Sequence, residues 1–211
     1  MPKPVRVRTR PRVRAPERTR ETILQTAAAE FYRHGFQGGS LNRIIADAGV
    51  TKGSLFHHYE GKHALGFAVI EEVVGAKIAE VWVKPLATSV DPVSDLQAIV
   101  RRVMLSRRKN PEKLAHGCPL NNFAQEMAPL DEGFRRRTES IYETWRASLA
   151  AALTRGIKAG IVRREVVPRR VAAFVVAAMT GIIGTAKNAQ SETLLADAGE
   201  ELLAYLGDLK P

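Results

Sequence analysis

The 211-residue sequence predicts an all-α protein, because apolar residues recur at helical spacing in long stretches and helix-capping residues lie between these stretches. We expect a small domain of three helices over residues 17–62 and a larger helical domain over residues 63–211. A basic, disordered arm at residues 1–16 would precede them.

The first expected helix covers residues 17–34, where apolar side chains recur every three or four residues and Gly35 offers a stop. Ser40 fits the N-cap of a second, short helix at residues 41–48. Gly49 suits the left-handed conformation that often follows a helix end. The sequence therefore predicts two helices joined by a short connection.

Thr51 fits the N-cap of a third helix, residues 52–59, in which Leu55 and Tyr59 are one turn apart and can face the core together. A helix, a four-residue turn with glycine and a second helix form a helix-turn-helix, whose second helix enters the DNA major groove. The third helix would then direct a polar face outward, with its positive N-terminal end suited to phosphate. The outward residues are Lys52, Gly53, Ser54, Phe56, His57 and His58.

The run from Ser40 to Leu65, SLNRIIADAGVTKGSLFHHYEGKHAL, closely resembles the DNA-binding signature of TetR-type bacterial transcriptional regulators. The resemblance implies a homodimeric, ligand-responsive repressor. It would bind a near-palindromic double-stranded DNA operator and leave it when a small-molecule effector enters the larger domain, here a small aromatic or reactive molecule.

The resemblance also assigns DNA contacts to residues of the second, third and fourth helices. Asn42 and Arg43 match positions that meet the DNA backbone or a base edge, and Lys62 matches a lysine that touches phosphate. Lysine and arginine can donate to guanine O6 and N7, which suits this assignment. The full predicted DNA-binding set is Ser40, Asn42, Arg43, Thr51, Lys52, Gly53, Ser54, Phe56, His57, His58, Tyr59 and Lys62.

The formal net charge is +10, and residues 1–20 contain seven Arg and one Lys against only Glu17. This concentration of positive charge predicts an arm that lies along nucleic acid. Deletion of residues 1–16 should then flatten the salt dependence of DNA binding. A solubilising tail and a misassigned start codon are the alternatives. A sequence-independent, nucleoid-type DNA-binding protein is the alternative for the whole chain.

The single cysteine, Cys118, excludes an internal disulfide framework, and the N-terminus lacks the apolar run of a secretory signal, so we expect a cytoplasmic protein. The longest apolar stretch, residues 171–186, is shorter than the roughly 20 residues of a membrane-spanning helix. Its small residues suit a buried helix or a seam between subunits, and we expect no membrane partner.

A metal site or an enzyme is the competing interpretation of the polar residues around His57. His57, His58, Glu60 and His63 lack the HExxH and HxxEH spacings of zinc enzymes. Phosphate-binding glycine loops and a nucleophile elbow are also missing from the sequence. We therefore predict no catalytic residues, no metal site and no cofactor.

The larger domain is expected to begin with a long helix, residues 61–84, that ends before Pro85. Further helices are predicted at residues 92–109 with an Asp91 cap, within residues 116–137, from Asp131 to about Ala159, and at residues 168–187 and 192–206. In the family that the chain resembles, the last two helices pair with their copies across a two-fold axis, which implies a homodimer. A core helix in a monomer is the alternative.

The segment from His116 to Arg137, HGCPLNNFAQEMAPLDEGFRRR, resembles the region after a Gly-Cys pair in a TetR subgroup that answers to small aromatic or reactive compounds. We predict a pocket with an apolar lining, Asn122 or Gln125 as polar anchor and Met104 as gap-filler. For Cys118 the favoured interpretation is a buried, inert thiol, and a sensor of electrophiles is the alternative. The remaining predicted lining residues are Phe123, Met127, Tyr142, Trp145 and Phe174.

Overall fold

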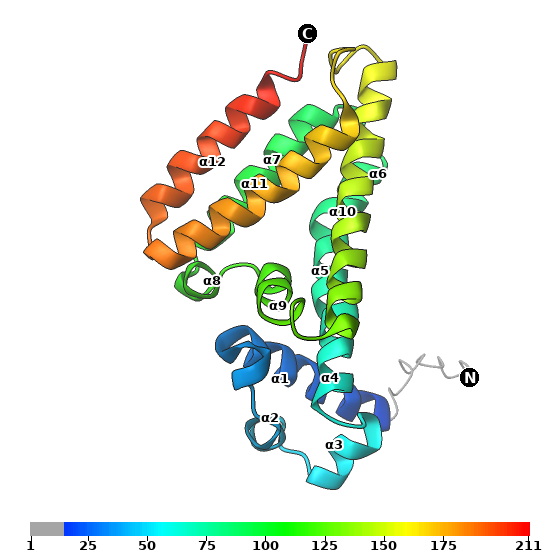
Figure 1. The fold of residues 1–211 in the computed structure, drawn as a ribbon, viewed down its shortest axis with the longest axis vertical. Coiled ribbons are helices and arrows are strands. Elements are labelled where there is room, and N and C mark those ends of the chain that lie inside the picture. The colour runs from blue at the N-terminus through cyan, green and yellow to red at the C-terminus, as the bar shows by residue number, and fades with distance from the viewer. Residues whose placement is uncertain (1–14) are drawn as a thin grey trace, which may run out of the picture.

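The computed structural model describes residues 15–211, which form helices and irregular connections with no strand (Figure 1). The predicted arm lies outside the described residues except for residues 15 and 16, which open the first helix. The helices are α1 (Ala15–Gly38), α2 (Leu41–Ala48), α3 (Lys52–His58), α4 (Lys62–Ala68), η1 (Val69–Gly75), α5 (Ala76–Ile78), η2 (Ala79–Val83), α6 (Lys84–Ala87), α7 (Pro92–Arg108), α8 (Pro111–His116), α9 (Pro119–Met127), α10 (Glu132–Lys158), α11 (Pro168–Ala189) and α12 (Glu192–Gly207).

The predicted helix-turn-helix is present as α2 and α3, packed against α1. The Ser40 hydroxyl accepts a hydrogen bond from the Arg43 N–H, and the Thr51 hydroxyl accepts one from the Ser54 N–H at 3.1 Å. Gly49 adopts the expected left-handed conformation with φ 63°. Local capping chemistry therefore fixes both ends of the turn, as the sequence predicted.

The first helix differs from its predicted end. Gly35 has φ 74° and ψ 171°, so the helical rod bends there and one further turn continues to Gly38. These dihedral angles are accessible to glycine and costly for other residues. The predicted stop at Gly35 is thus a kink, and it directs the chain toward α2.

The long helix after the helix-turn-helix is one rod from α4 through α6, with wider π-type turns at η1 and η2. The prediction that it ends before Pro85 is wrong, because the rod continues to Ala87. Proline has no N–H to donate to the carbonyl of Val81 one turn earlier. The Arg102 side chain donates to that carbonyl instead, at 3.4 Å.

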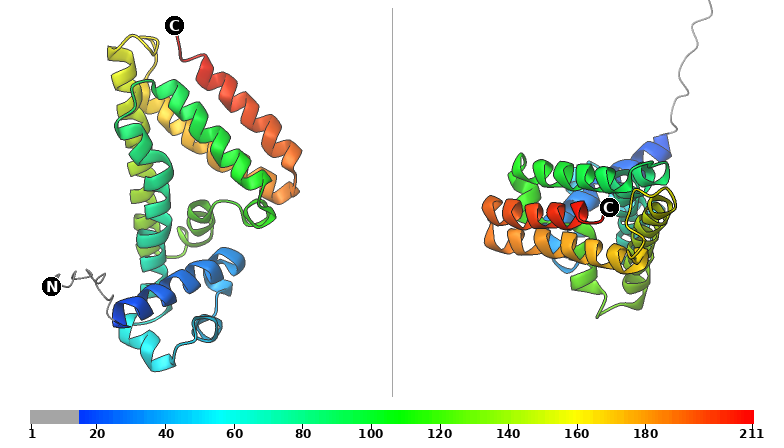
Figure 2. Two further views of the ribbon diagram at one scale, coloured as in Figure 1. Left: turned by 180° about the vertical axis from the view of Figure 1, so that it is seen from behind. Right: turned by 90° about the horizontal axis from the view of Figure 1, so that it is seen from above.

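In the larger domain, α12 packs against both α7 and α11, and α10 packs along both α11 and the rod (Figure 2). Asp91, Asp131 and Ser191 cap α7, α10 and α12 with their side chains. Helix α8 was not predicted, and its N-cap Asn110 accepts a hydrogen bond from the Lys113 N–H. Figure 1 shows α8 and α9 between this bundle and α1, where they connect the two domains.

Helix α11 is longer than the predicted apolar stretch and is, by length and composition, able to cross a membrane. Only 39% of its most apolar window is buried within the chain. On the uncovered side, the Phe174 ring is 50% exposed and packs edge-on against Tyr205 of α12, with ring centroids 4.7 Å apart. The α11–α12 pair therefore has an apolar face that this chain does not cover.

Candidate DNA-binding surface and effector site

The recognition helix α3 has one buried side and one exposed side. Leu55 is fully buried and Tyr59, which follows the helix, is 5% exposed. Four of the predicted contact residues are exposed and two are partly buried, so the predicted division of the helix into an inner and an outer face is confirmed. The exposed residues are Lys52, Gly53, Phe56 and His57, and the partly buried residues are Ser54 and His58.

Arg43 does not extend freely from the second helix. Its guanidinium donates to the Glu30 carboxylate through Nε at 2.7 Å and to the Gly38 carbonyl at 2.8 Å. The Ser40 N–H donates to the same carboxylate at 2.8 Å. Arg43 thus fixes α2 to α1, although half of its side chain stays exposed and its DNA contact stays a prediction. Asn42 and Thr51 are also exposed.

Glu30 is the buried charge at the centre of this domain, with 6% of its surface exposed. Burial acts to raise the pKa of Glu30, but the hydrogen bonds from Arg43 and Ser40 outweigh burial and hold the pKa below its usual value. The ionised carboxylate therefore holds α1, α2 and their connection together at neutral pH.

Two further predicted DNA-contact residues, Tyr59 and Lys62, contact other residues of the same domain. Tyr59 is buried, with the Arg20 guanidinium 5.4 Å from its ring centroid, so it packs inside the domain. The Lys62 ammonium donates to the Gln37 carbonyl at 2.9 Å and lies 4.9 Å from the Phe36 ring centroid. Burial lowers the pKa of Lys62. Tyr59 therefore packs inside the domain, whereas Lys62 is only partly buried and its phosphate contact stays a prediction.

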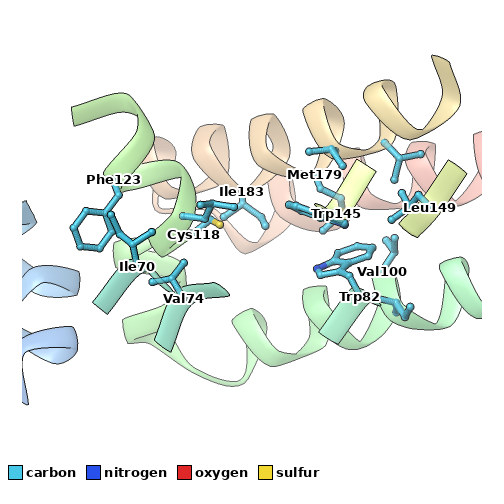
Figure 3. Close-up of a cluster of buried hydrophobic side chains, with 14 of the residues drawn as sticks. Ile70, Val74, Trp82, Val100, Cys118, Phe123, Trp145, Leu149, Met179 and Ile183 are labelled. Atoms are coloured by element: carbon cyan, nitrogen blue, oxygen red, sulfur yellow. The ribbon is translucent and has the colours of Figure 1, made fainter. Parts of the chain in front are cut away.

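The predicted effector residues divide into separate groups. Cys118, Asn122, Tyr142 and Trp145 lie among the helices of the larger domain, and Figure 3 shows Cys118 in the apolar interior between Ile70 and Ile183. Tyr142 and Asn122 each make a hydrogen bond to another residue, whereas Trp145 Nε1 is buried without a partner among the described residues. The Tyr142 hydroxyl donates to Asn121 Oδ1 at 3.3 Å, and the Asn122 amide donates to the His116 carbonyl at 2.8 Å.

Phe123 belongs to a second group at the junction of the two domains. Its ring lies 6.2 Å from that of Phe31 and 6.4 Å from that of Phe36, both on α1, and stacks on Phe134 of α10. Met127, at the end of the same helix, is also buried. These two residues pack α9 into the junction, whereas Met104 packs against Gly199 of α12.

The prediction that Phe174 and Gln125 face the same interior is wrong. Phe174 is half exposed on the outer side of α11, and Gln125 is exposed on α9. Helical spacing places both residues on helices correctly, but it does not show which face a neighbouring helix covers. A groove of about 200 Å³ between the rod and α10 involves none of the predicted effector residues, its lining being Gly75, Ile78, Ala79, Val83, Ser140, Ile141 and Thr144.

Sequence reasoning missed the contacts between the two domains. The Glu126 carboxylate on α9 accepts hydrogen bonds from the N–H groups of Phe36 and Gln37, each at 2.8 Å. The Tyr32 hydroxyl of α1 donates to the Gly117 carbonyl at 3.1 Å, directly before Cys118. Burial raises the pKa of Tyr32 to about 12, so it stays a neutral donor.

The sequence also gave no prediction for Arg107, a partly buried arginine in the last turn of α7. It follows Val100 and Met104, two inward-facing residues of α7, at the same helical spacing. This periodicity was the signal in the sequence that Arg107 turns inward.

The contacts of Glu126 and Tyr32 have no such signal. Their partners are about 85–90 residues away in sequence, and no local pattern indicates them.

Comparisons with known proteins agree with this architecture. A family model described as "Bacterial regulatory proteins, tetR family" matches residues 23–69, and "Tetracyclin repressor-like, C-terminal domain" matches residues 92–202. The chain is 28% identical over 165 residues to the HTH-type transcriptional repressor DhaR of Mycobacterium sp. (strain GP1), covering 78% of this chain and 80% of that protein.

Two further relatives are transcriptional regulators. The HTH-type transcriptional regulator LmrA of Bacillus subtilis (strain 168) is 30% identical over 131 residues, which cover 60% of this chain and 66% of LmrA. The crystal structure of a TetR transcriptional regulator from Chloroflexus aurantiacus J-10-fl has a TM-score of 0.83 and 28% identity, covering 94% of this chain and 98% of that chain. The chain therefore belongs to the TetR family of bacterial transcriptional regulators and is a DNA-binding regulator rather than an enzyme.

Proposed function

We propose that this protein is a homodimeric, cytoplasmic repressor that binds a near-palindromic operator and is released from it by a small aromatic or reactive molecule. The observation that carries the proposal is the two-sided recognition helix. Leu55 and Tyr59 anchor α3 in the domain, while Lys52 and His57 are exposed on the other side. An exposed polar helix face anchored in this way suits insertion into the major groove.

The uncovered face of α11 and α12 supports the dimer. It presents the exposed Phe174 ring together with small residues, which allow a second helix pair to approach closely. A two-fold axis would bring each α11 and α12 against their copies and set two recognition helices on one side of the DNA. A dimer of this kind reads two half-sites, which accounts for a near-palindromic operator.

The junction supports release by an effector. Helix α9 carries Asn122 beside the larger domain's interior and Glu126 against the backbone of α1. A molecule that enters near Cys118 and shifts α9 therefore also shifts the end of α1. In a dimer this movement changes the spacing of the two recognition helices, so that they no longer fit both half-sites.

Selection of bound sites from randomised DNA duplexes tests the proposal. The expected result is a near-palindrome whose half-sites are separated by about one helical turn, roughly 34–36 Å, or a multiple of it. Binding to that site should persist in excess random DNA. Loss of all binding under that competition would instead support the nucleoid-type alternative and contradict a repressor.

Cys118 permits a separate test of the proposal that a reactive molecule releases the operator. Its thiol is free and buried, with 8% of the residue exposed. Alkylation of the operator-bound dimer with a small electrophile should release the DNA, and the Cys118→Ser variant should stay bound. Retention of the operator by the fully alkylated protein would contradict a sensing role for Cys118.

A further inference from the structure

Arg107 carries a charge into the interior of the larger domain. It lies in the last turn of α7, one turn after the buried Met104. One guanidinium nitrogen donates to the Val103 carbonyl of its own helix at 3.2 Å. Its Nε is buried and has no hydrogen-bond partner among the residues that the structure describes.

Other partly buried arginines in the described chain differ from Arg107. Arg20 pairs with Glu72, Arg137 with Glu71, and Arg146 with both Glu139 and Glu143. Within residues 15–211, Arg107 has no carboxylate partner. Burial lowers the pKa of Arg107, although a guanidinium stays protonated at neutral pH. A buried cation without a paired anion costs stability, and a bound anion would offset this cost.

The groups around Arg107 are suited to an anion. The Cys118 thiol and the Tyr32 hydroxyl are the titratable groups close enough to Arg107 to affect its pKa. His116, on the adjacent α8, packs against the Tyr32 ring with centroids 5.3 Å apart. The side chain of Lys187, from α11, passes Gly117, and its ammonium donates to Asn122 Oδ1 at 3.1 Å. Two basic side chains, Arg107 and Lys187, therefore flank the Gly117–Cys118 connection. Neither of them pairs with a carboxylate in the described residues.

We propose that Arg107 binds a carboxylate group of the effector, so that the effector is a small organic acid whose apolar part lies toward Cys118. This inference rests on the proposed function and adds the chemical class of the ligand. A planar guanidinium fork matches the two oxygens of a carboxylate and makes short, charge-assisted hydrogen bonds with them. The apolar residues around Cys118, which include Ile70 and Ile183, suit the rest of such a molecule (Figure 3).

The first test uses the stability of the full-length protein without ligand. Replacing Arg107 by the similarly long but uncharged methionine, Arg107→Met, removes an uncompensated buried charge, so the melting temperature should rise by about 2–4 °C. Arg137→Met is the matched control, because Arg137 pairs with Glu71 and its loss should lower the melting temperature. A fall for Arg107→Met would overturn the proposal, since it would show that Arg107 supports the ligand-free fold.

The second test measures release of the selected operator from the full-length dimer by matched probes, namely benzoate with benzamide, butyrate with butyramide, and phenyl phosphate. At least one carboxylate should release the DNA at a concentration tenfold or more below that of its amide. Arg107→Gln should reduce this preference to about onefold, and Arg107→Lys should retain part of it. An equally effective amide, a response to phenyl phosphate alone, no response to either carboxylate, or an unchanged preference in Arg107→Gln would each overturn the inference.

Operator binding without a probe is measured for the wild-type protein and every variant. If the wild-type protein fails to bind a specific site, the proposed function fails. If it binds specifically but shows no preference for acids over amides, only the inference about Arg107 fails.

Discussion

The Glu126 carboxylate on α9 accepts two hydrogen bonds from α1, one of them from the Phe36 N–H that follows the kink at Gly35. These N–H groups are available because the backbone leaves helical geometry at Gly35. The Lys62 ammonium holds the Gln37 carbonyl of the same segment. A single carboxylate therefore links the helix next to Cys118 with the segment that leads into the helix-turn-helix.

Glu126→Ala should weaken operator binding without unfolding either domain. It leaves two N–H groups without their charged acceptor, at a cost of about 1–2 kcal/mol. Because the ligand-free arrangement binds the operator in our proposal, titration with labelled operator should show a roughly 5–30-fold loss of affinity at 25 °C. Gln125→Ala, at the exposed neighbouring position, is the control and should bind as the wild-type protein does. Equal affinities for the two variants would show that this contact does not transmit a signal.

Gly35→Ala should disturb the same contact from the other side. A Cβ atom at Gly35 would lie 2.9 Å from Glu126 Oε2, and its φ of 74° and ψ of 171° are strained for alanine. We expect a loss of about 2–3 kcal/mol in the free energy of unfolding, measured in urea. Gly49→Ala, where φ is 63° but no atom lies within 4 Å, should lose only about 1 kcal/mol.

A double-mutant cycle separates strain from the clash at Gly35. In the Glu126→Ala background the carboxylate is gone, so Gly35→Ala should cost less than it does in the wild-type protein. Strictly additive effects would indicate that backbone strain accounts for the whole loss.

The helix-turn-helix could be predicted from the sequence because its determinants are local. Ser40, Gly49 and Thr51 act on residues within four positions of themselves. The spacing of Leu55 and Tyr59 likewise indicates which side of the recognition helix is buried. Neighbouring residues determine these features, and no distant contact overrides them.

The junction and the effector site could not be predicted in the same way. Phe174 and Phe123 are both aromatic residues on apolar helices, yet one is exposed and the other lies between α1 and α10. The Lys62 ammonium donates to the carbonyl of Gln37, 25 residues earlier, and no local pattern indicates this contact. Such outcomes depend on how distant helices pack, which a single sequence does not show.

Acid should loosen the DNA-binding domain through Glu30. Its pKa is lowered in the folded state, so its contribution to stability is fully present above its unfolded value of about 4.5 and is lost as the pH falls through the lower, folded value. Glu30→Gln should remove this contribution at neutral pH and flatten the decline in stability below about pH 4.5. Urea unfolding at a series of pH values measures both effects. A parallel decline in Glu30→Gln and the wild-type protein would assign acid sensitivity to other carboxylates.

Lys52→Ala should weaken operator binding and reduce its dependence on salt. Lys52 is exposed at the start of α3, where an ammonium group can meet a DNA phosphate. If each subunit loses one phosphate contact, the slope of log affinity against log salt should fall by about 2 for a dimer. Lys77→Ala, an exposed lysine on the rod, removes the same charge far from α3 and should leave the slope unchanged. Equal slopes for both variants would contradict contact between Lys52 and the DNA backbone.

Phe174→Glu should convert the dimer to monomers, because Phe174 is a half-exposed aromatic residue on the uncovered face of α11. Two copies of the new carboxylate near a two-fold axis would repel each other in an apolar seam, whereas each isolated subunit would keep its fold because the ring is not part of its core. Analytical ultracentrifugation should show a monomer, and specific operator affinity should fall at least a hundredfold, since one recognition helix cannot hold a two-half-site operator. Leu130→Glu, at a more exposed apolar position outside α11 and α12, should stay dimeric. A dimeric Phe174→Glu variant would place the subunit interface on another face and contradict the arrangement of recognition helices proposed above.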